Sequence, residues 1–123
     1  MDREETIAVI DDDAAVCQGT RGLLRSLGYS AVGFASAEEF LDSGSVNKFS
    51  CVITDMRMPG MSGIELQEAL IAKGHRVPII FMTAYAEEKT KAHAMSAGAT
   101  GLLTKPFAEK TLVECLNSAL QEG

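Results

Sequence analysis

The chain has 123 residues, of which 46% are hydrophobic and 23% are charged, and its formal net charge is -6. These proportions are typical of one globular domain and exclude a disordered chain, and no apolar run approaches the roughly 20 residues of a membrane span. The acidic balance, without a basic cluster, argues against direct nucleic-acid binding. Residues 1–5 lack the apolar stretch of a secretion signal, so we expect one cytoplasmic domain spanning 1–123, with no membrane contact.

Short apolar runs alternate along the chain with segments of helical periodicity. In chain order, the predicted elements are a strand at 6–10, a helix from about Val16 to Gly28, a strand at 31–34, a short helix after Ser36, a strand at 51–54, a helix from Ser62 to Gly74, a strand at 79–82, a helix from about Glu87 to Gly98, a strand at 101–104 and a last helix striped by Leu112, Leu116, Ala119 and Leu120.

Two of the predicted helices begin with the pattern of a capping box. Ser36 precedes Glu39 by three residues, and Ser62 precedes Glu65 by the same spacing. The helix after Ser62 is predicted to run through Ile64, Leu70 and Ile71 and to stop at Gly74.

Strands and helices that alternate five times predict right-handed crossovers and a parallel sheet. The strands are apolar throughout, as a sheet covered on both sides requires. We therefore predict an α/β fold: a single doubly wound five-stranded parallel sheet in the flavodoxin-like order 2-1-3-4-5, with helices on both faces. In this order the ligand crevice lies at the carboxyl ends of strands one and three.

Polar side chains follow four of the strands at their carboxyl ends, which meet at one edge of a parallel sheet. They are Asp11, Asp12 and Asp13 after the first strand, Asp55 after the third, Thr83 after the fourth and Lys105 after the fifth. Asp13 is predicted to be only an N-cap or first-turn acid of the following helix. The other carboxylates, the hydroxyl and the ammonium are predicted to converge on one rim.

Carboxylates gathered in this way repel one another, by roughly 4 kcal/mol for a pair about 4 Å apart at an effective dielectric near 20. Such a group raises its own pKa values or recruits a cation. Oxygen ligands without histidine or cysteine favour a hard ion, Mg²⁺ or Mn²⁺. With the ion bound, one carboxylate can attack phosphorus and form an aspartyl phosphate, while a lysine and a threonine hold phosphoryl oxygens.

Four segments contain these residues: Val-Ile-Asp-Asp-Asp at 9–13, Thr-Asp-Met-Arg-Met-Pro-Gly-Met-Ser-Gly at 54–63, Met-Thr-Ala at 82–84 and Leu-Thr-Lys-Pro-Phe at 103–107. In this order they resemble the receiver domain of bacterial two-component response regulators, over nearly the whole chain. The segment at 54–63 is similar to FixJ-like regulators, which usually carry a DNA-binding helix-turn-helix after the receiver. Because the chain ends with its fifth helix, we expect no output domain in it.

The resemblance implies that Asp55 is the phosphoacceptor of a signalling switch, one that is not an enzyme but assists its own phosphorylation and dephosphorylation. It implies that Asp12 and Asp55 bind Mg²⁺ directly, with the backbone carbonyl of Arg57 as a third ligand. Asp11 would act on the metal through water, and Lys105 would contact the phosphoryl group.

The resemblance also assigns a switch and partners. Thr83 is the switch hydroxyl, and Leu102 stands where the family commonly has Tyr or Phe, which puts the usual threonine–aromatic coupling in doubt. The Lys105–Pro106 bond is expected to be cis. A sensor histidine kinase is the expected phosphodonor. The fourth helix, fifth strand and fifth helix are expected to bind a partner or a second copy when phosphorylated, through a face that includes Lys91, Met95, Leu102 and Glu109.

Other interpretations stay open at the level of sequence. Each rim residue can also be read as a helix-capping, turn-forming, strand-ending or solvated residue. The main alternative function is a phosphorylation-independent interaction module of the same fold, which Leu102 mildly favours. A hydrolase working through an aspartyl phosphate would need Asp13 as its acid–base group, and a flavin-binding protein would need a phosphate loop where this chain has acids.

The bulky Arg57 and Tyr85 are predicted to slow hydrolysis of an acyl phosphate.

Overall fold

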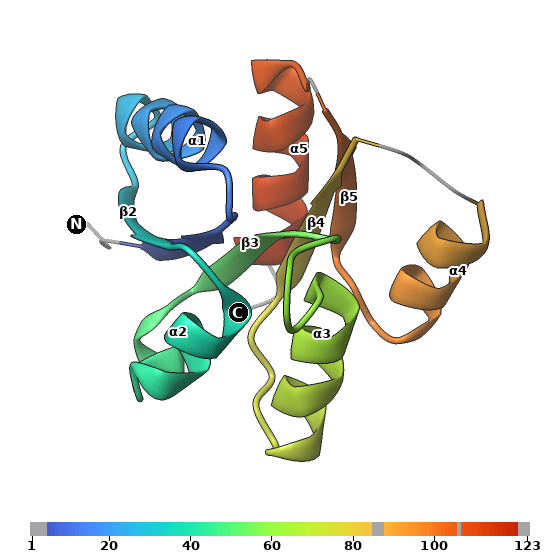
Figure 1. Ribbon diagram of the computed structural model, residues 1–123. Coiled ribbons are helices and arrows are strands. Elements are labelled where there is room, and N and C mark those ends of the chain that lie inside the picture. The colour runs from blue at the N-terminus through green and yellow to red at the C-terminus, as the bar shows by residue number, and fades with distance from the viewer. Residues whose placement is uncertain (1–4, 85–87, 106, 121–123) are drawn as a thin grey trace.

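The computed structural model describes residues 5–84, 88–105 and 107–120. Strands and helices alternate along this part of the chain, as predicted (Figure 1). The elements are β1 (Thr6–Ile10), α1 (Ala14–Ser26), β2 (Ser30–Phe34), α2 (Ala37–Asp42), the 3-10 helix η1 (Val46–Lys48), β3 (Cys51–Asp55), α3 (Gly63–Ala72), β4 (Ile79–Thr83), α4 (Glu88–Ser96), β5 (Gly101–Thr104) and α5 (Glu109–Leu120).

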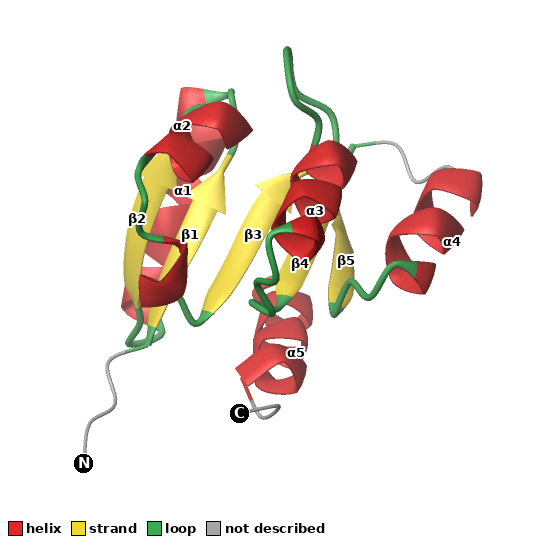
Figure 2. Ribbon diagram, turned by 90° about the horizontal axis from the view of Figure 1, so that it is seen from below, coloured by secondary structure: helices red, strands yellow, loops and turns green. Residues whose placement is uncertain are grey.

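The five strands form one sheet in the order β2-β1-β3-β4-β5, and all paired strands are parallel, which confirms the predicted topology (Figure 2). The register keeps the carboxyl ends level, since Ile10 opposes Thr54 and Thr83 opposes Thr104. Residues at or just beyond these ends therefore lie along one edge of the sheet.

Both faces of the sheet are buried, because alternate residues of each apolar strand enter opposite cores. Ile7 and Val9 of β1 pack with residues of α1 and α5, whereas Ala8 and Ile10 pack with residues of α2, α3 and α4. Figure 1 shows the same division, with α1 and α5 on one side of the sheet and α2, α3 and α4 on the other. We call these the α1/α5 core and the α2/α3/α4 core.

One of the two predicted capping boxes is complete. At the start of α3, Ser62 Oγ accepts from Glu65 N at 3.1 Å and Glu65 Oε1 accepts from Ser62 N at 2.9 Å. At the start of α2, Ser36 Oγ accepts from Glu39 N at 3.0 Å, but Glu39 Oε1 accepts from Ala35 N at 2.9 Å. The prediction for Ser36 was therefore half wrong, because the carboxylate reaches one residue farther back and satisfies a donor outside the helix.

The helix predicted through Ile64, Leu70 and Ile71 is confirmed as α3, although Ile71 is 54% exposed. The buried positions of this helix are Gly63, Leu66, Gln67 and Leu70. With about 100° between successive residues, a stripe centred on Leu66 and Leu70 turns position 71 away from the sheet.

Three strands extend one residue beyond the prediction, β2 at its start and β3 and β4 at their ends. Asp55 and Thr83 are therefore the last residues of β3 and β4 and do not begin the loops. The three cysteines are free, with Cys17 and Cys51 buried and Cys115 half-buried. None of the helices in the described part of the chain has the length and apolarity needed to cross a membrane.

Candidate functional site

Backbone hydrogen bonds continue the sheet past the strand ends and fix the residues that follow. Asp11 N donates to Phe34 O at 3.1 Å, which holds the start of the segment after β1 against β2. Lys105 N donates to Thr83 O at 2.8 Å, which holds the segment after β5 against β4. The backbone at both positions is therefore hydrogen-bonded to a neighbouring strand, although the two positions lie far apart in the sequence.

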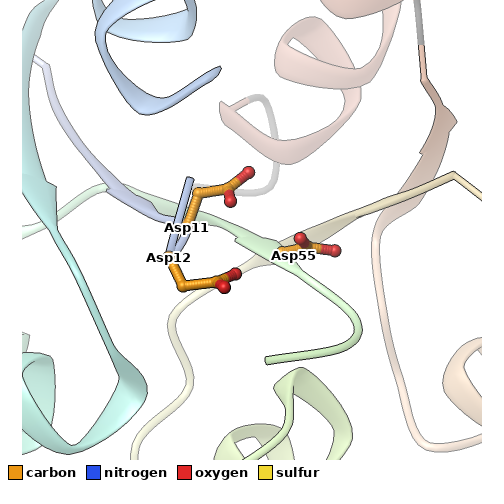
Figure 3. A group of neighbouring side chains, drawn as sticks. All are labelled: Asp11, Asp12 and Asp55. Atoms are coloured by element: carbon orange, nitrogen blue, oxygen red, sulfur yellow. The ribbon is translucent and has the colours of Figure 1, made fainter. Parts of the chain in front are cut away.

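The three predicted acids meet at the carboxyl ends of β1 and β3. Asp11, Asp12 and Asp55 each offer a carboxylate oxygen, and these oxygens all lie within 4.8 Å of one another. Figure 3 shows the three side chains together, projecting to the same side of the strand ends. Asp11 is 1% exposed and Asp12 is exposed, so the group extends from the interior to the solvent.

Lys105 places one ammonium against two of these acids. Its Nζ lies 3.0 Å from Asp11 Oδ2 and 3.1 Å from Asp55 Oδ2. Burial of Lys105 disfavours its charge, but its hydrogen bonds and its attraction to the two carboxylates outweigh burial and raise the pKa of the ammonium. The lysine is therefore charged at neutral pH.

Asp11 is held in the interior of the cluster. Burial raises the pKa of its carboxyl, and hydrogen bonds from Asp13 N and Lys105 partly oppose that shift. The bond from Asp13 N to Asp11 Oδ1 measures 2.9 Å. Asp13 itself is the N-cap of α1 and accepts from the amides of Ala15 and Val16, as predicted.

The loop between β3 and α3, residues 56–62, packs closely on Asp55. Arg57 N lies 3.4 Å from Asp55 Oδ1, and Gly63 N donates to Met56 O at 3.0 Å. A Cβ at Gly63 would lie 2.4 Å from the backbone oxygen of Asp55, so only glycine permits this approach. No pattern in the sequence indicated this role for Gly63.

The predicted switch residues lie on β4 and β5, with Thr83 at the end of β4 and Leu102 opposite Phe81 in the middle of β5. Thr83 is 2% exposed at the end of β4, and Leu102 of β5 is partly buried and packs on the α2/α3/α4 core. Pro106 and Tyr85 lie outside the described residues, and so does the predicted cis bond between Lys105 and Pro106.

One residue near the site was not foreseen. Glu38, in the first turn of α2, accepts a hydrogen bond at its Oε2 from Met61 N at 2.9 Å. The two residues are 23 positions apart and join a helix to an irregular loop, so no periodic pattern links them.

The donor set fits a hard divalent cation. The cluster has three carboxylates and one ammonium, which contacts two of them, so it keeps an excess of negative charge, and its ligand atoms are all oxygen. Oxygen ligands with an open, solvent-facing side are the preferred environment of Mg²⁺, which retains several waters. The exposed Asp12 provides that side.

Residues 7–117 match the family model of the response regulator receiver domain. The chain belongs to this family. Among curated proteins, the receiver domain is 38% identical over 120 residues to the response regulator protein TodT of Pseudomonas putida, and 39% identical over 117 residues to the transcriptional regulatory protein FixJ of Bradyrhizobium diazoefficiens. These alignments cover 98% and 95% of this chain but 53% and 57% of the relatives. The chain thus spans about half the length of these relatives.

Solved structures show the same fold. The receiver domain superposes on a low-resolution structure of the response regulator StyR with a TM-score of 0.89 and 43% identity, covering 98% of this chain and 61% of that one. It superposes on a crystal structure of FixJ-N with a TM-score of 0.89 and 28% identity, covering 99% and 98% of the two chains. The predicted resemblance to FixJ-like receivers is confirmed.

Proposed function

We propose that this receiver domain is a phosphorylation-driven switch, in which Asp55 accepts a phosphoryl group from a sensor histidine kinase in the cytoplasm. The observation that carries the proposal is the convergence of three carboxylates and Lys105 at one edge of the sheet. Phosphoryl transfer depends mainly on positioning and charge stabilisation, and this cluster supplies both.

Asp55 has the position of a nucleophile. Its side chain is 14% exposed, so an incoming phosphoryl group can reach it, while Lys105 and Arg57 N fix its two oxygens. A carboxylate oxygen of Asp55 attacks the phosphorus of a phosphohistidine and forms an O–P bond. The P–N bond breaks, and its electron pair leaves with the imidazole nitrogen, which takes a proton from solvent.

A divalent cation, Mg²⁺ or Mn²⁺, would neutralise charge on the phosphoryl oxygens when bound. Asp12, Asp55 and the backbone carbonyl of Arg57 would hold it directly, and Asp11 would hold it through water. Asp11 also keeps Lys105 beside Asp55 through its own contact with the ammonium.

Two further side chains respond to the new group. The Lys105 ammonium exchanges its contact with the Asp55 carboxylate for one with a phosphoryl oxygen, as a compact charge on a flexible stem can do. The Thr83 hydroxyl donates to another phosphoryl oxygen. Arg57 beside the acceptor restricts the access of water and slows hydrolysis of the acyl phosphate.

Phosphorylation changes the surface formed by α4, β5 and α5, which binds the partner. Met95 of α4 is 47% exposed, Leu102 of β5 is partly buried against the α2/α3/α4 core, and Glu109 opens α5. Phosphorylation adds about 1.5 to 2 negative charges at Asp55 and favours the state in which this surface binds a second copy of the domain.

The whole protein is proposed to regulate transcription. FixJ and the protein TdiR of Thauera aromatica are named transcriptional regulatory proteins, and this chain spans about half the length of each. A DNA-binding output domain joined to the receiver in the whole protein would provide that activity, and the receiver would control it without touching nucleic acid.

The experiment is incubation with Mg²⁺ and acetyl phosphate, followed by intact mass and by size-exclusion chromatography. We expect the wild type to gain one phosphoryl group, Asp55→Asn to gain none, and chelation of the cation to prevent the gain. An earlier elution of the phosphorylated wild type would support dimerisation. Wild type that gains no mass would overturn the proposal in favour of a phosphorylation-independent interaction module.

A further inference from the structure

The loop of residues 56–62 is fixed at both ends by backbone contacts. Met56 N donates to Met82 O of β4 at 2.8 Å, and Gly63 N donates to Met56 O at 3.0 Å. The proposed function assigns the Arg57 carbonyl of this loop to the cation, so the path of the backbone between these ends matters. The middle of the loop reaches a different element, α2, through the bond from Met61 N to Glu38 Oε2.

The loop is shaped to receive that carboxylate. Gly60 has a φ of +76°, which L residues rarely adopt, and a Cβ there would lie 2.7 Å from Glu38 Oε2. The absence of a side chain at Gly60 therefore leaves room for Glu38 Oε2, and the Met61 amide donates its hydrogen bond to the same oxygen.

Glu38 stands on a rigid base. Its neighbours Ala37 and Phe40 are fully buried in the α2/α3/α4 core, and the Phe40 ring lies 5.2 Å from the Phe34 ring of β2 in an edge-to-face arrangement. The short helix is thereby held against the sheet, and the carboxylate of Glu38 is held over the loop.

Apolar packing alone leaves the loop less defined. Met58 and Met61 are partly buried against the α2/α3/α4 core. Methionine side chains adapt to irregular gaps, so this packing draws the loop inward without fixing the direction of its peptide groups. A hydrogen bond to a charged acceptor is directional and strong, so Glu38 fixes the direction of the Met61 peptide group, which the methionine packing does not.

We propose that Glu38 is a positioning residue of the phosphoacceptor site: it orients residues 57–61, and with them the Arg57 carbonyl, toward the cation. This assignment rests on the proposed function. Partners that orient a metal ligand from outside typically account for about 10–100-fold in metal affinity.

The test compares Glu38→Ala, Glu38→Gln and Asp42→Ala with the wild type. Amide hydrogen exchange of Met61 is measured without divalent cation, and Mg²⁺ affinity is measured by calorimetry. We expect Glu38→Ala to accelerate exchange at Met61 and to weaken Mg²⁺ binding about tenfold, the low end for an indirect contact. Glu38→Gln retains an acceptor oxygen, so we expect its Met61 exchange rate and its Mg²⁺ affinity to be close to those of the wild type. Asp42→Ala removes the same charge from the other end of α2 and leaves Mg²⁺ affinity within about twofold.

A second variant tests the geometry from the loop side. Gly60→Ala places a methyl group against the Glu38 carboxylate, so it should weaken Mg²⁺ binding as Glu38→Ala does. The double variant should lose little further Mg²⁺ affinity, because both changes remove the same contact. Unfolding curves show whether each variant folds.

The outcomes separate the two ideas. If the wild type and Glu38→Ala bind Mg²⁺ equally well, the positioning role of Glu38 is overturned, but the proposed function is not. A loss in Glu38→Ala that Glu38→Gln shares also overturns it, because the effect is then one of charge. Wild type that takes up no Mg²⁺ overturns the proposed function and this assignment with it.

Discussion

The ammonium of Lys105 lies 3.1 Å from Oδ2 of Asp55, a residue 50 positions earlier in the chain. The same ammonium lies 3.0 Å from Oδ2 of Asp11. The ammonium that follows β5 thus holds together two acids, one after β1 and one at the end of β3, and its loss would leave their repulsion unopposed.

We therefore predict that Lys105→Ala lowers the free energy of unfolding by about 1–3 kcal/mol without divalent cation. This is less than for a fully buried pair, because the lysine side chain is 19% exposed. Urea unfolding in EDTA and in Mg²⁺ checks the prediction, and Mg²⁺ should recover part of the loss. Lys110→Ala, at an exposed position of α5, is the matched control and should cost little. A Lys105→Ala variant more stable than the wild type in EDTA would contradict the prediction.

The adjacent acids Asp12 and Asp13 are predicted to have separable effects. Asp13→Ala removes the N-cap of α1 and should cost about 1 kcal/mol, or about 4 °C in Tm, while the protein still gains stability from Mg²⁺. Asp12→Ala should cost little stability in EDTA but should abolish the gain from Mg²⁺. Thermal unfolding of both variants with and without the cation distinguishes them. If the two variants behave alike, the division of roles is wrong.

Gly63→Ala is predicted to lower the free energy of unfolding by about 2–3 kcal/mol. The new Cβ would lie 2.4 Å from the Asp55 backbone oxygen and 3.1 Å from Met56 Cα, and backbone atoms cannot turn aside. Gly22→Ala is the control, since a Cβ there meets nothing within 4 Å and should stabilise α1 by about 0.5–1 kcal/mol. Denaturant unfolding measures both, and a neutral Gly63→Ala would refute the close approach.

Stability should fall in alkali. Burial raises the pKa of the Cys51 thiol from 9.0 to about 12, so between these values the unfolded chain releases a proton that the folded protein keeps. This difference favours unfolding as the pH rises, by about 1.4 kcal/mol per pH unit from Cys51. The raised pKa of Lys105 acts in the same direction, because its ion pairs are lost when it deprotonates. Unfolding from pH 8 to 11 should show a shallower decline in Cys51→Ala, while Val52→Ala should retain the full slope.

The fold could be predicted because its signals are repetitive. Five apolar runs separated by helical segments leave few arrangements for a parallel sheet, and the strand ends then determine where Asp11, Asp55 and Lys105 meet. The acids were recognised because they follow strands, which is a property of position along the chain.

What the sequence did not reveal depends on contacts without a period. The bond from Met61 to Glu38 joins an irregular loop to a helix, and the carboxylate of Glu39 reaches Ala35 in place of Ser36. Ile71 fits an apolar helical pattern but is exposed, because the orientation of α3 on the sheet is set by Leu66 and Leu70. Each of these details follows from how elements dock in three dimensions.

The three acids and the ammonium lie at the carboxyl ends of β1, β3 and β5, between residues 11 and 105. No short peptide can therefore reproduce their arrangement. A fragment that ends before Lys105 keeps every carboxylate but loses the counter-charge, and a fragment that begins after Asp12 loses two of the three acids. The cation uptake proposed for this edge would therefore directly measure how many molecules in a sample are completely folded.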